Sequence, residues 1–385
     1  MTFFAGKLHS KLPDIETSIF AVMSRLALEH GAVNLSQGFP DFQIDEGLID
    51  RVSHYMKLGY NQYAPFQGVD SLRKAIARKF ELTFGVDYDW KDEINITAGA
   101  TQALNTVIST FIHHNDEAII FEPAYDSYGP SIRAVGGIVR KYSMRPPDFS
   151  INWQEVTGLI TDKTRLIIIN SPHNPTGSLL REEDLRQLDV ITAGTDIIVL
   201  SDEVYEHLVF DGEKHVSACT FPSLQSRSFV VGSFGKTFHA TGWKMGFVLA
   251  PVNLMAEFRK LHQFVVFTCN TPIQHAIADF LEEPLQYQKL PQFYQQKRDY
   301  FLEGIKGSSF EVIPSYGTYF QLLSYKNVSD LPEMEFARWL VEKHGVAAIP
   351  LAPFYEDKRD QQLLRFCFAK EEKTLKKATD ILCKI

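Results

Sequence analysis

The sequence feature that most constrains the fold is a regular alternation of short apolar runs with longer amphipathic segments between Ile94 and Pro251. Several runs are apolar at consecutive positions, which is typical of strands buried on both faces of a sheet. The segments between them, such as 101–113 and 182–193, carry apolar residues at helical spacing. This alternation predicts an α/β fold with a mostly parallel central sheet sandwiched by helices, and leaves the strand order open. The seven runs are 94–97, 118–122, 138–142, 165–170, 197–201, 229–232 and 245–250.

After about Pro272 the pattern becomes a mixture of helices and strand-like runs that is typical of a smaller α+β domain. An amphipathic helix at 19–29 lies in an N-terminal segment that we expect to pack against this small domain. We therefore predict a large domain inserted into a small one. The expected C-terminal elements are strand-like runs at 311–313, 317–323 and 363–368, a short apolar run at 346–351, and helices at 334–344 and from Glu371. The predicted parts are an N-terminal segment at 1–45, a large domain at 46–280 and a small C-terminal domain at 281–385.

Composition excludes several functional classes. The 385 residues include 39 Lys and Arg against 47 Asp and Glu, a formal net charge of −8, so nucleic acid and anionic membranes are poor candidate partners. No apolar run is long enough to span a membrane, and the first 13 residues lack the sustained apolar core of a secretory signal. The cysteines lie far apart without a CxxC pair, so we expect no metal site, no disulfide framework and a cytoplasmic protein. They are Cys219, Cys269, Cys367 and Cys383.

Ligands in open α/β sheets bind beyond the carboxyl ends of the strands, so the residues that follow each run are candidates for a site. After the run 94–97, small residues at Gly99, Ala100 and Thr101 lead into a helix. The free N–H groups at such a helix start suit a phosphate, although an ordinary strand–helix turn is the favoured explanation when this stretch is taken alone.

Three further strand ends carry polar residues. Asn174 lies in a stiff Pro-rich loop at 171–177, and Asp202 ends a buried run, where a carboxylate is costly unless it meets a cation or caps a helix. Lys236 follows the run 229–232 among small and aromatic neighbours, where burial can lower the pKa of its amine. A phosphate cradle, an Asn loop, an acid and a lysine are together the set that pyridoxal phosphate requires.

The same stretches closely resemble the class I aminotransferases of pyridoxal-phosphate fold type I. The resemblance is strongest to the branch that holds bacterial methionine aminotransferases, kynurenine aminotransferases and glutamine transaminase K, and it extends from about Leu12 to the C-terminus. The motifs that carry it are 34–42, 61–63, 97–101, 172–177, 201–205, 233–238 and 364–370.

The resemblance implies that Lys236 forms the internal aldimine with pyridoxal 5'-phosphate and later moves the Cα proton. It implies that Asp202 keeps the pyridine nitrogen protonated, while Asn174 and Tyr205 donate hydrogen bonds to the ring oxygen. Tyr125 matches the aromatic residue that stacks on the ring.

The phosphate site implied by the resemblance combines the backbone at 99–101 with Ser233 and Lys244. Tyr63 matches a tyrosine that reaches the phosphate from a neighbouring subunit. We therefore expect a homodimer with shared active sites.

For the substrate, the resemblance implies that Arg365 binds the α-carboxylate, assisted by the backbone at Gly38 and by Asn174. A surface salt bridge is the alternative for Arg365. Phe20 and Phe267 match pocket aromatics, which favour methionine, aromatic or glutamine-like amino acids as donors and a 2-oxo acid as acceptor in a ping-pong reaction. A cysteine-S-conjugate β-lyase that uses the same cofactor and lysine is the alternative activity.

Overall fold

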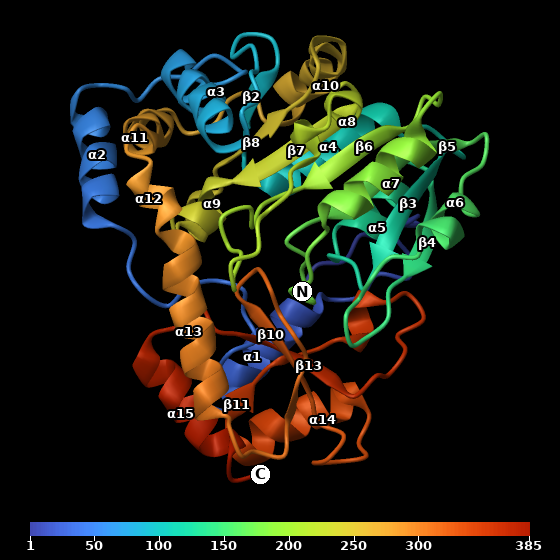
Figure 1. The fold of residues 1–385 in the computed structure, drawn as a ribbon, viewed down its shortest axis with the longest axis vertical. Helices are drawn as coiled ribbons and strands as arrows, with labels where there is room; N and C mark the ends of the chain where they lie inside the picture. The colour runs from blue at the N-terminus through green and yellow to red at the C-terminus, as the bar shows by residue number, and fades with distance from the viewer.

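The computed structural model describes residues 1–385. Its upper part in Figure 1 is built around a seven-stranded sheet in the order β2-β8-β7-β6-β5-β3-β4. β8 is antiparallel to both of its neighbours, while β3 to β7 run parallel, which confirms the predicted mostly parallel sheet. Each of the seven predicted runs overlaps one strand. The strands are β2 (Ile94–Thr97), β3 (Glu117–Glu122), β4 (Ile138–Ser143), β5 (Thr164–Asn170), β6 (Ile198–Asp202), β7 (Ser228–Ser233) and β8 (Gly246–Leu249).

Successive residues of the central strands enter two different hydrophobic cores. In β5, Leu166 and Ile168 belong to one core and Ile167 and Ile169 to the other, as the consecutive apolar pattern predicts. Helices α4, α5 and α10 cover the first face, and α3, α7 and α11 contribute to the second. The helices of the upper part are α2 (Glu46–Lys57), α3 (Asp70–Phe84), α4 (Ala100–Phe111), α5 (Tyr128–Ala134), α6 (Trp153–Thr157), α7 (Glu182–Thr192), α8 (Pro222–Gln225), α9 (Phe234–Thr237), α10 (Val252–Val265) and α11 (Thr271–Leu281).

The lower part contains an antiparallel four-stranded sheet in the order β12-β13-β10-β9. β1 near the N-terminus pairs in parallel with β11, and α13 descends from the upper to the lower part in Figure 1. The strands are β1 (Val33–Asn34), β9 (Glu311–Val312), β10 (Phe320–Ser324), β11 (Val346–Ala347), β12 (Ile349–Pro350) and β13 (Leu363–Cys367). The helices are α1 (Ile19–Glu29), α13 (Leu290–Gly304), α14 (Glu333–Trp339) and α15 (Glu372–Leu382), and the short α12 (Leu285–Gln288) connects α11 to the top of α13 in Figure 1. The domain boundaries after residues 45 and 280 stay a prediction.

One predicted strand starts later than its apolar sequence suggests. The run 317–323 is strand only from Phe320, because Thr318 has a left-handed backbone with φ 68°. The N–H groups of Gly317 and Thr318 donate instead to the carbonyls of Gly177 and Leu208 in loops of the upper part. The turn before β10 is therefore attached to the loops that surround the strand ends of the large sheet.

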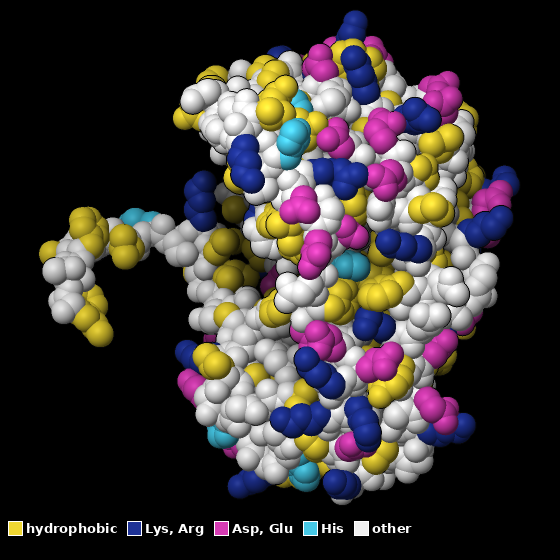
Figure 2. Space-filling view, turned by 90° about the vertical axis from the view of Figure 1, so that its left-hand side faces the viewer, with side chains coloured by type: hydrophobic (Ala, Val, Ile, Leu, Met, Phe, Trp, Pro, Cys, Tyr) yellow, Lys and Arg dark blue, Asp and Glu magenta, His cyan; other side chains and the backbone are white.

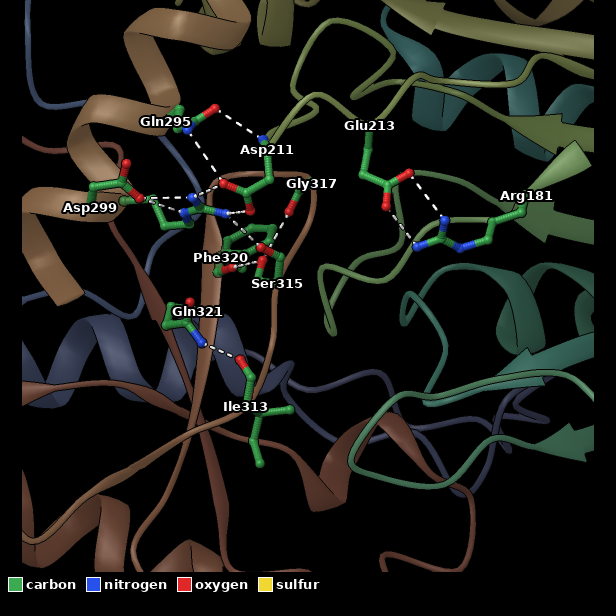
Figure 3. Close-up of polar contacts among 11 residues, drawn as sticks. Arg181, Asp211, Glu213, Gln295, Asp299, Ile313, Ser315, Gly317, Phe320 and Gln321 are labelled. Atoms are coloured by element: carbon green, nitrogen blue, oxygen red, sulfur yellow. Dashed lines mark hydrogen bonds and ion pairs between the residues drawn. The ribbon is translucent and has the colours of Figure 1, made fainter.

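A buried arginine on α13 strengthens this junction (Figure 3). Both terminal nitrogens of Arg298 donate to the carboxylate of Asp211, at 2.6 and 2.7 Å, and Nη1 also donates to the Ser315 carbonyl at 2.9 Å. The Ser315 hydroxyl in turn donates to the carbonyls of Gly317 and Phe320. These contacts fix the turn that enters β10 against the upper part.

The N-terminal segment projects from the body of the molecule and carries hydrophobic side chains (Figure 2). Residues 1–11 are all exposed, Phe3 and Phe4 among them. None of the helices combines the length and the apolarity that crossing a bilayer requires.

Candidate active site

The carboxyl ends of β5, β6 and β7 meet at one edge of the large sheet and enclose a cavity of about 180 Å³. Asn170 ends β5 and is the register partner of Asp202, which ends β6, while Ser233 ends the adjacent β7. The cavity therefore lies beyond the carboxyl ends of the strands, where the sequence predicts a ligand site. The residues that line the cavity include Gly99, Ala100, Thr101, Tyr125, Asn170, Asn174, Asp202, Tyr205, Ser233, Lys236 and Lys244.

One end of the cavity is built for an anion. Gly99 caps the N-terminus of α4 with φ 76°, a conformation that favours glycine, and leaves the first N–H groups of the helix unpaired within it. Lys244 approaches closely, since a Cβ at Gly99 would lie 3.3 Å from its Nζ. A lysine ammonium, the positive end of a helix dipole and the lining hydroxyl of Ser233 thus converge at this end.

A buried carboxylate also lines the cavity. Asp202 is 3% exposed, and burial raises the pKa of its carboxyl to about 6. The Tyr128 hydroxyl donates to its Oδ2 at 2.6 Å, while Oδ1 accepts only a long contact of 3.4 Å from the Val204 N–H. Because Oδ1 is so weakly satisfied, it can accept a strong hydrogen bond from a ligand.

Lys236 lies between these groups on the short helix α9. Its Nζ donates to the Tyr319 hydroxyl at 2.8 Å and to the Gly38 carbonyl at 3.2 Å. Burial lowers the pKa of the amine to about 8. A lysine with this pKa is partly neutral near pH 7, which is the form that acts as a nucleophile or a base.

Arg365 on β13 is fully buried and makes no ion pair with a carboxylate. Its Nη1 donates to Oδ1 of Asn174 at 2.7 Å, its Nη2 to the Ser36 carbonyl at 3.3 Å, and its Nε has no partner. This burial and the missing ion pair exclude the surface salt bridge that was the alternative reading. A buried guanidinium with an unpaired N–H calls for an anionic ligand.

Aromatic rings surround the guanidinium. Its carbon lies 3.8 Å from the ring centre of Phe320 and 5.1 Å from that of Phe20. Gly38 passes so close to Phe320 that a Cβ there would lie 2.8 Å from the ring. The predicted substrate residues Phe20, Gly38, Asn174 and Arg365 are therefore brought together at one side of the cavity.

Two predicted aromatic residues line the cavity itself. The Tyr125 hydroxyl lies 3.4 Å from the Thr101 hydroxyl, next to the anion end. The Tyr205 ring packs edge-on against Tyr319, with 5.1 Å between ring centres, and Lys236 Nζ lies 5.7 Å from the Tyr205 ring centre. Tyr205 therefore sits beside the lysine.

The structure does not bring Tyr63 and Phe267 to the cavity of their own chain. Tyr63 is 78% exposed and Phe267 is 57% exposed, and the two rings pack edge-on with 5.0 Å between their centres. Their predicted contacts with cofactor and substrate stay predictions that require a second copy of the chain.

Sequence reasoning missed residues that act through others. Asn170 donates to the Asp202 carbonyl at 2.8 Å and accepts from the Asn174 N–H at 2.8 Å, so it holds the Asn174 loop against β6. Its place at the end of a predicted strand was an available signal. Tyr128 and Tyr319 had no comparable local signal, because each meets its partner only across the fold.

The fold and this site define an α/β enzyme in which a lysine, an acid and an anion-binding helix start share one cavity. The sequence matches the family model described as aminotransferase class I and II over residues 31–382. The chain belongs to this family, whose members are generally dependent on pyridoxal phosphate.

The chain is also similar to individual aminotransferases of this family. The chain is 48% identical to the methionine aminotransferase of Escherichia coli (strain K12) over 374 residues, which are 97% of each chain. It is 32% identical to the human kynurenine–oxoglutarate transaminase 1, over 95% of each chain. The crystal structure of YbdL from Escherichia coli, identified as having a methionine aminotransferase function, superposes with a TM-score of 0.97 at 47% identity. That match covers 98% of this chain and 100% of that one.

Proposed function

We propose that this chain is a pyridoxal-phosphate-dependent aminotransferase that moves the α-amino group of methionine, aromatic or glutamine-like amino acids to a 2-oxo acid. The observation that carries the proposal is Arg365, which is buried without an acidic partner and is joined through Asn174 to the cavity that contains Lys236. An α-carboxylate fits this guanidinium, since Arg binds carboxylates in a two-pronged geometry.

The donors of the cavity fit the phosphate of the cofactor. The start of α4 at residues 99–101, Ser233 and Lys244 would hold it. A backbone N–H cradle beside a lysine is a common arrangement for a phosphate dianion.

The remaining lining residues fit the ring of the cofactor. The weakly satisfied Oδ1 of Asp202 would accept from a protonated ring nitrogen, and Tyr125 would pack on the ring face. Asn174 Oδ1 accepts a hydrogen bond from Arg365, so Asn174 Nδ2 is free to donate to the ring oxygen. The Tyr205 hydroxyl would donate to the same oxygen. The site therefore has at least one suitable group for each polar feature of the cofactor.

When bound, pyridoxal phosphate supplies an aldehyde for the substrate amine and a ring that accepts the electron pair left by the departing α-proton. In its neutral form, Lys236 Nζ takes this proton from the α-carbon. The resulting ammonium holds the proton until the lysine donates it again later in the reaction. Asp202 keeps a negative charge next to the ring, which stabilises the charge that develops during proton removal. Arg365 holds the carboxylate of the amino acid in one half of the ping-pong reaction and of the oxo acid in the other.

The charges of the cavity support an uncharged donor side chain. Its charged lining residues are Lys236, Lys244 and Asp202, and each has a role in the scheme above. No further cation lines the cavity to pair with a second substrate carboxylate. The relatives at 48% and 47% identity are both described as methionine aminotransferases, which supports methionine as the first candidate donor.

We also propose a homodimer with shared sites. Tyr63 and Phe267 form an exposed aromatic pair, and further exposed apolar residues lie near them in the sequence at 56–60 and 264–265. Exposed apolar area of this kind is typical of a protein–protein interface. If a second copy of the chain covered this surface, Tyr63 and Phe267 of the first copy would lie beside the cavity of the second copy.

The experiment that tests the activity is product analysis with purified protein, L-methionine and a panel of 2-oxo acids. The proposal expects 4-methylthio-2-oxobutanoate and the amino acid of the oxo-acid acceptor in equal amounts. Release of ammonia and pyruvate from a cysteine S-conjugate without an oxo acid, and no transfer from methionine, would contradict it in favour of the β-lyase.

A further inference from the structure

A tyrosine from the small-domain side of the cleft contacts the reacting amine. Tyr319 immediately precedes β10 and is fully buried, and its hydroxyl accepts a hydrogen bond from Lys236 Nζ at 2.8 Å. The same hydroxyl donates to the Gly38 carbonyl at 2.5 Å. The hydroxyl proton is thus directed at Gly38, and the oxygen lone pairs face the lysine.

The position of this hydroxyl is fixed by hydrogen bonds of the turn that carries Tyr319 and by a contact between aromatic rings. The preceding Thr318 N–H donates to Leu208, and the Ser315 hydroxyl bridges the carbonyls of Gly317 and Phe320 (Figure 3). The edge-on contact with Tyr205 limits rotation of the ring. A hydroxyl held in this way is a preorganised acceptor.

We infer that Tyr319 is a positioning residue for Lys236, whose hydroxyl together with the Gly38 carbonyl holds the amine beside the substrate whenever that amine is not bonded to the cofactor. The inference rests on the proposed function, because it concerns the step in which Lys236 Nζ takes and returns the α-proton. An unbonded lysine side chain has several rotamers, and fixing one of them removes the entropy cost of reaching the proton.

The contact also has an electrostatic consequence for the amine. A fixed acceptor stabilises the ammonium more than the neutral amine, so we expect removal of the Tyr319 hydroxyl to lower the pKa of Lys236 further in the direction set by burial. The other titratable groups that act on this amine are Cys367, Arg365, Lys244 and Asp202. Tyr319→Phe leaves these four side chains chemically unchanged.

The neighbouring Tyr294 provides a matched control. It is also fully buried, its ring centre lies 5.9 Å from that of Tyr319, and its hydroxyl has no hydrogen-bond partner. Tyr294→Phe and Tyr319→Phe therefore each remove one buried hydroxyl from the same aromatic cluster, and only the second removes a contact with Lys236.

The first readout uses the apoenzyme and does not depend on turnover. The rate at which an amine-reactive anhydride labels Lys236 is followed against pH by mass spectrometry of its peptide. The wild type is expected to show a midpoint near pH 8. Tyr319→Phe should shift this midpoint about one unit lower, and Tyr294→Phe should not shift it.

The second readout is the steady-state kinetics of the holoenzyme with methionine. Tyr319→Phe should lower kcat about tenfold, because a mobile base reaches the α-proton less often, and should change KM less than about twofold. A Tyr319→Phe variant in which either the labelling midpoint or kcat equals that of the wild type overturns the inference. The proposed function fails if the wild type transfers no amino group, whereas the inference fails if the wild type is active and Tyr319→Phe behaves like it. The two failures are therefore distinguishable.

Discussion

Arg365 Nη1 donates to Asn174 Oδ1 at 2.7 Å, and this bond joins a strand of the lower sheet to a loop at the edge of the upper sheet. The two residues are 191 positions apart in the sequence. The contact engages the amide oxygen of Asn174 with the arginine, and Asn174 also lines the cavity that contains Lys236. A single asparagine thereby links Arg365, the proposed carboxylate-binding group, to the lysine-containing cavity.

The lowered pKa of Lys236 predicts how the apoenzyme takes up its cofactor. Only the neutral amine attacks an aldehyde, and the pKa of about 8 makes the neutral fraction grow tenfold per pH unit below that value. The rate of absorbance change after adding pyridoxal phosphate should rise with pH and level off near pH 8. A rate that keeps rising toward 10.5, the ordinary value for lysine, would show that burial does not perturb the amine.

Replacing Arg365 by alanine should weaken binding of both substrates. Loss of a buried charge that pairs with a carboxylate costs at least about 2 kcal/mol, so KM for methionine and for the oxo acid should rise about 30-fold or more. Arg365→Lys keeps the charge and should be less impaired, though without two-pronged binding. Arg365→Ala should also lose the preference for methionine over 3-methylthiopropylamine, which lacks the carboxylate. A preserved preference would assign carboxylate binding to another residue.

Two arginine pairs shown in Figure 3 should differ in their contribution to stability. Arg298 is 7% exposed and binds Asp211 with both terminal nitrogens, so Arg298→Ala should lower the free energy of unfolding by roughly 2 kcal/mol. Arg181 pairs with Glu213 but is 59% exposed, and Arg181→Ala should cost less than about 1 kcal/mol. Chemical denaturation measures both. Equal losses would mean that burial of Arg298 does not strengthen its contacts.

Shared sites can be tested with mixed dimers. Lys236→Ala and Tyr63→Ala should each be strongly impaired, but in a mixed dimer one site would combine an intact Lys236 with an intact Tyr63 from the partner. Reassembly of a one-to-one mixture should restore about one quarter of wild-type activity. If Tyr63 served its own chain, both sites of the mixed dimer would be defective and no activity would return.

The large sheet and part of the site could be predicted because their signals are local. Most strands of the sheet are apolar runs, and the cavity residues Asn174, Asp202 and Lys236 lie within four positions of the end of such a run. The strand order could not be predicted, since it depends on crossovers and not on any one run. β10 begins later than its apolar run because contacts with distant loops override the local pattern.

The positioning residues could not be predicted for a related reason. Tyr128 lies 74 residues from Asp202, and Tyr319 lies 83 residues from Lys236. In the sequence each is one aromatic residue among 15 tyrosines and 29 phenylalanines. Only the fold shows which of these hydroxyl groups meets a carboxylate or an amine.

The central claim is that this cavity uses pyridoxal phosphate to remove the amino group of an uncharged amino acid. The most direct test is the absorbance spectrum of the purified, cofactor-loaded protein when L-methionine, L-phenylalanine, L-glutamine, L-kynurenine or L-aspartate is added without an oxo acid. We expect conversion of bound pyridoxal phosphate to pyridoxamine phosphate, fastest with methionine or an aromatic donor and slowest with aspartate, and no conversion in Lys236→Ala. A spectrum that no amino acid changes, or equal conversion in Lys236→Ala, would contradict it.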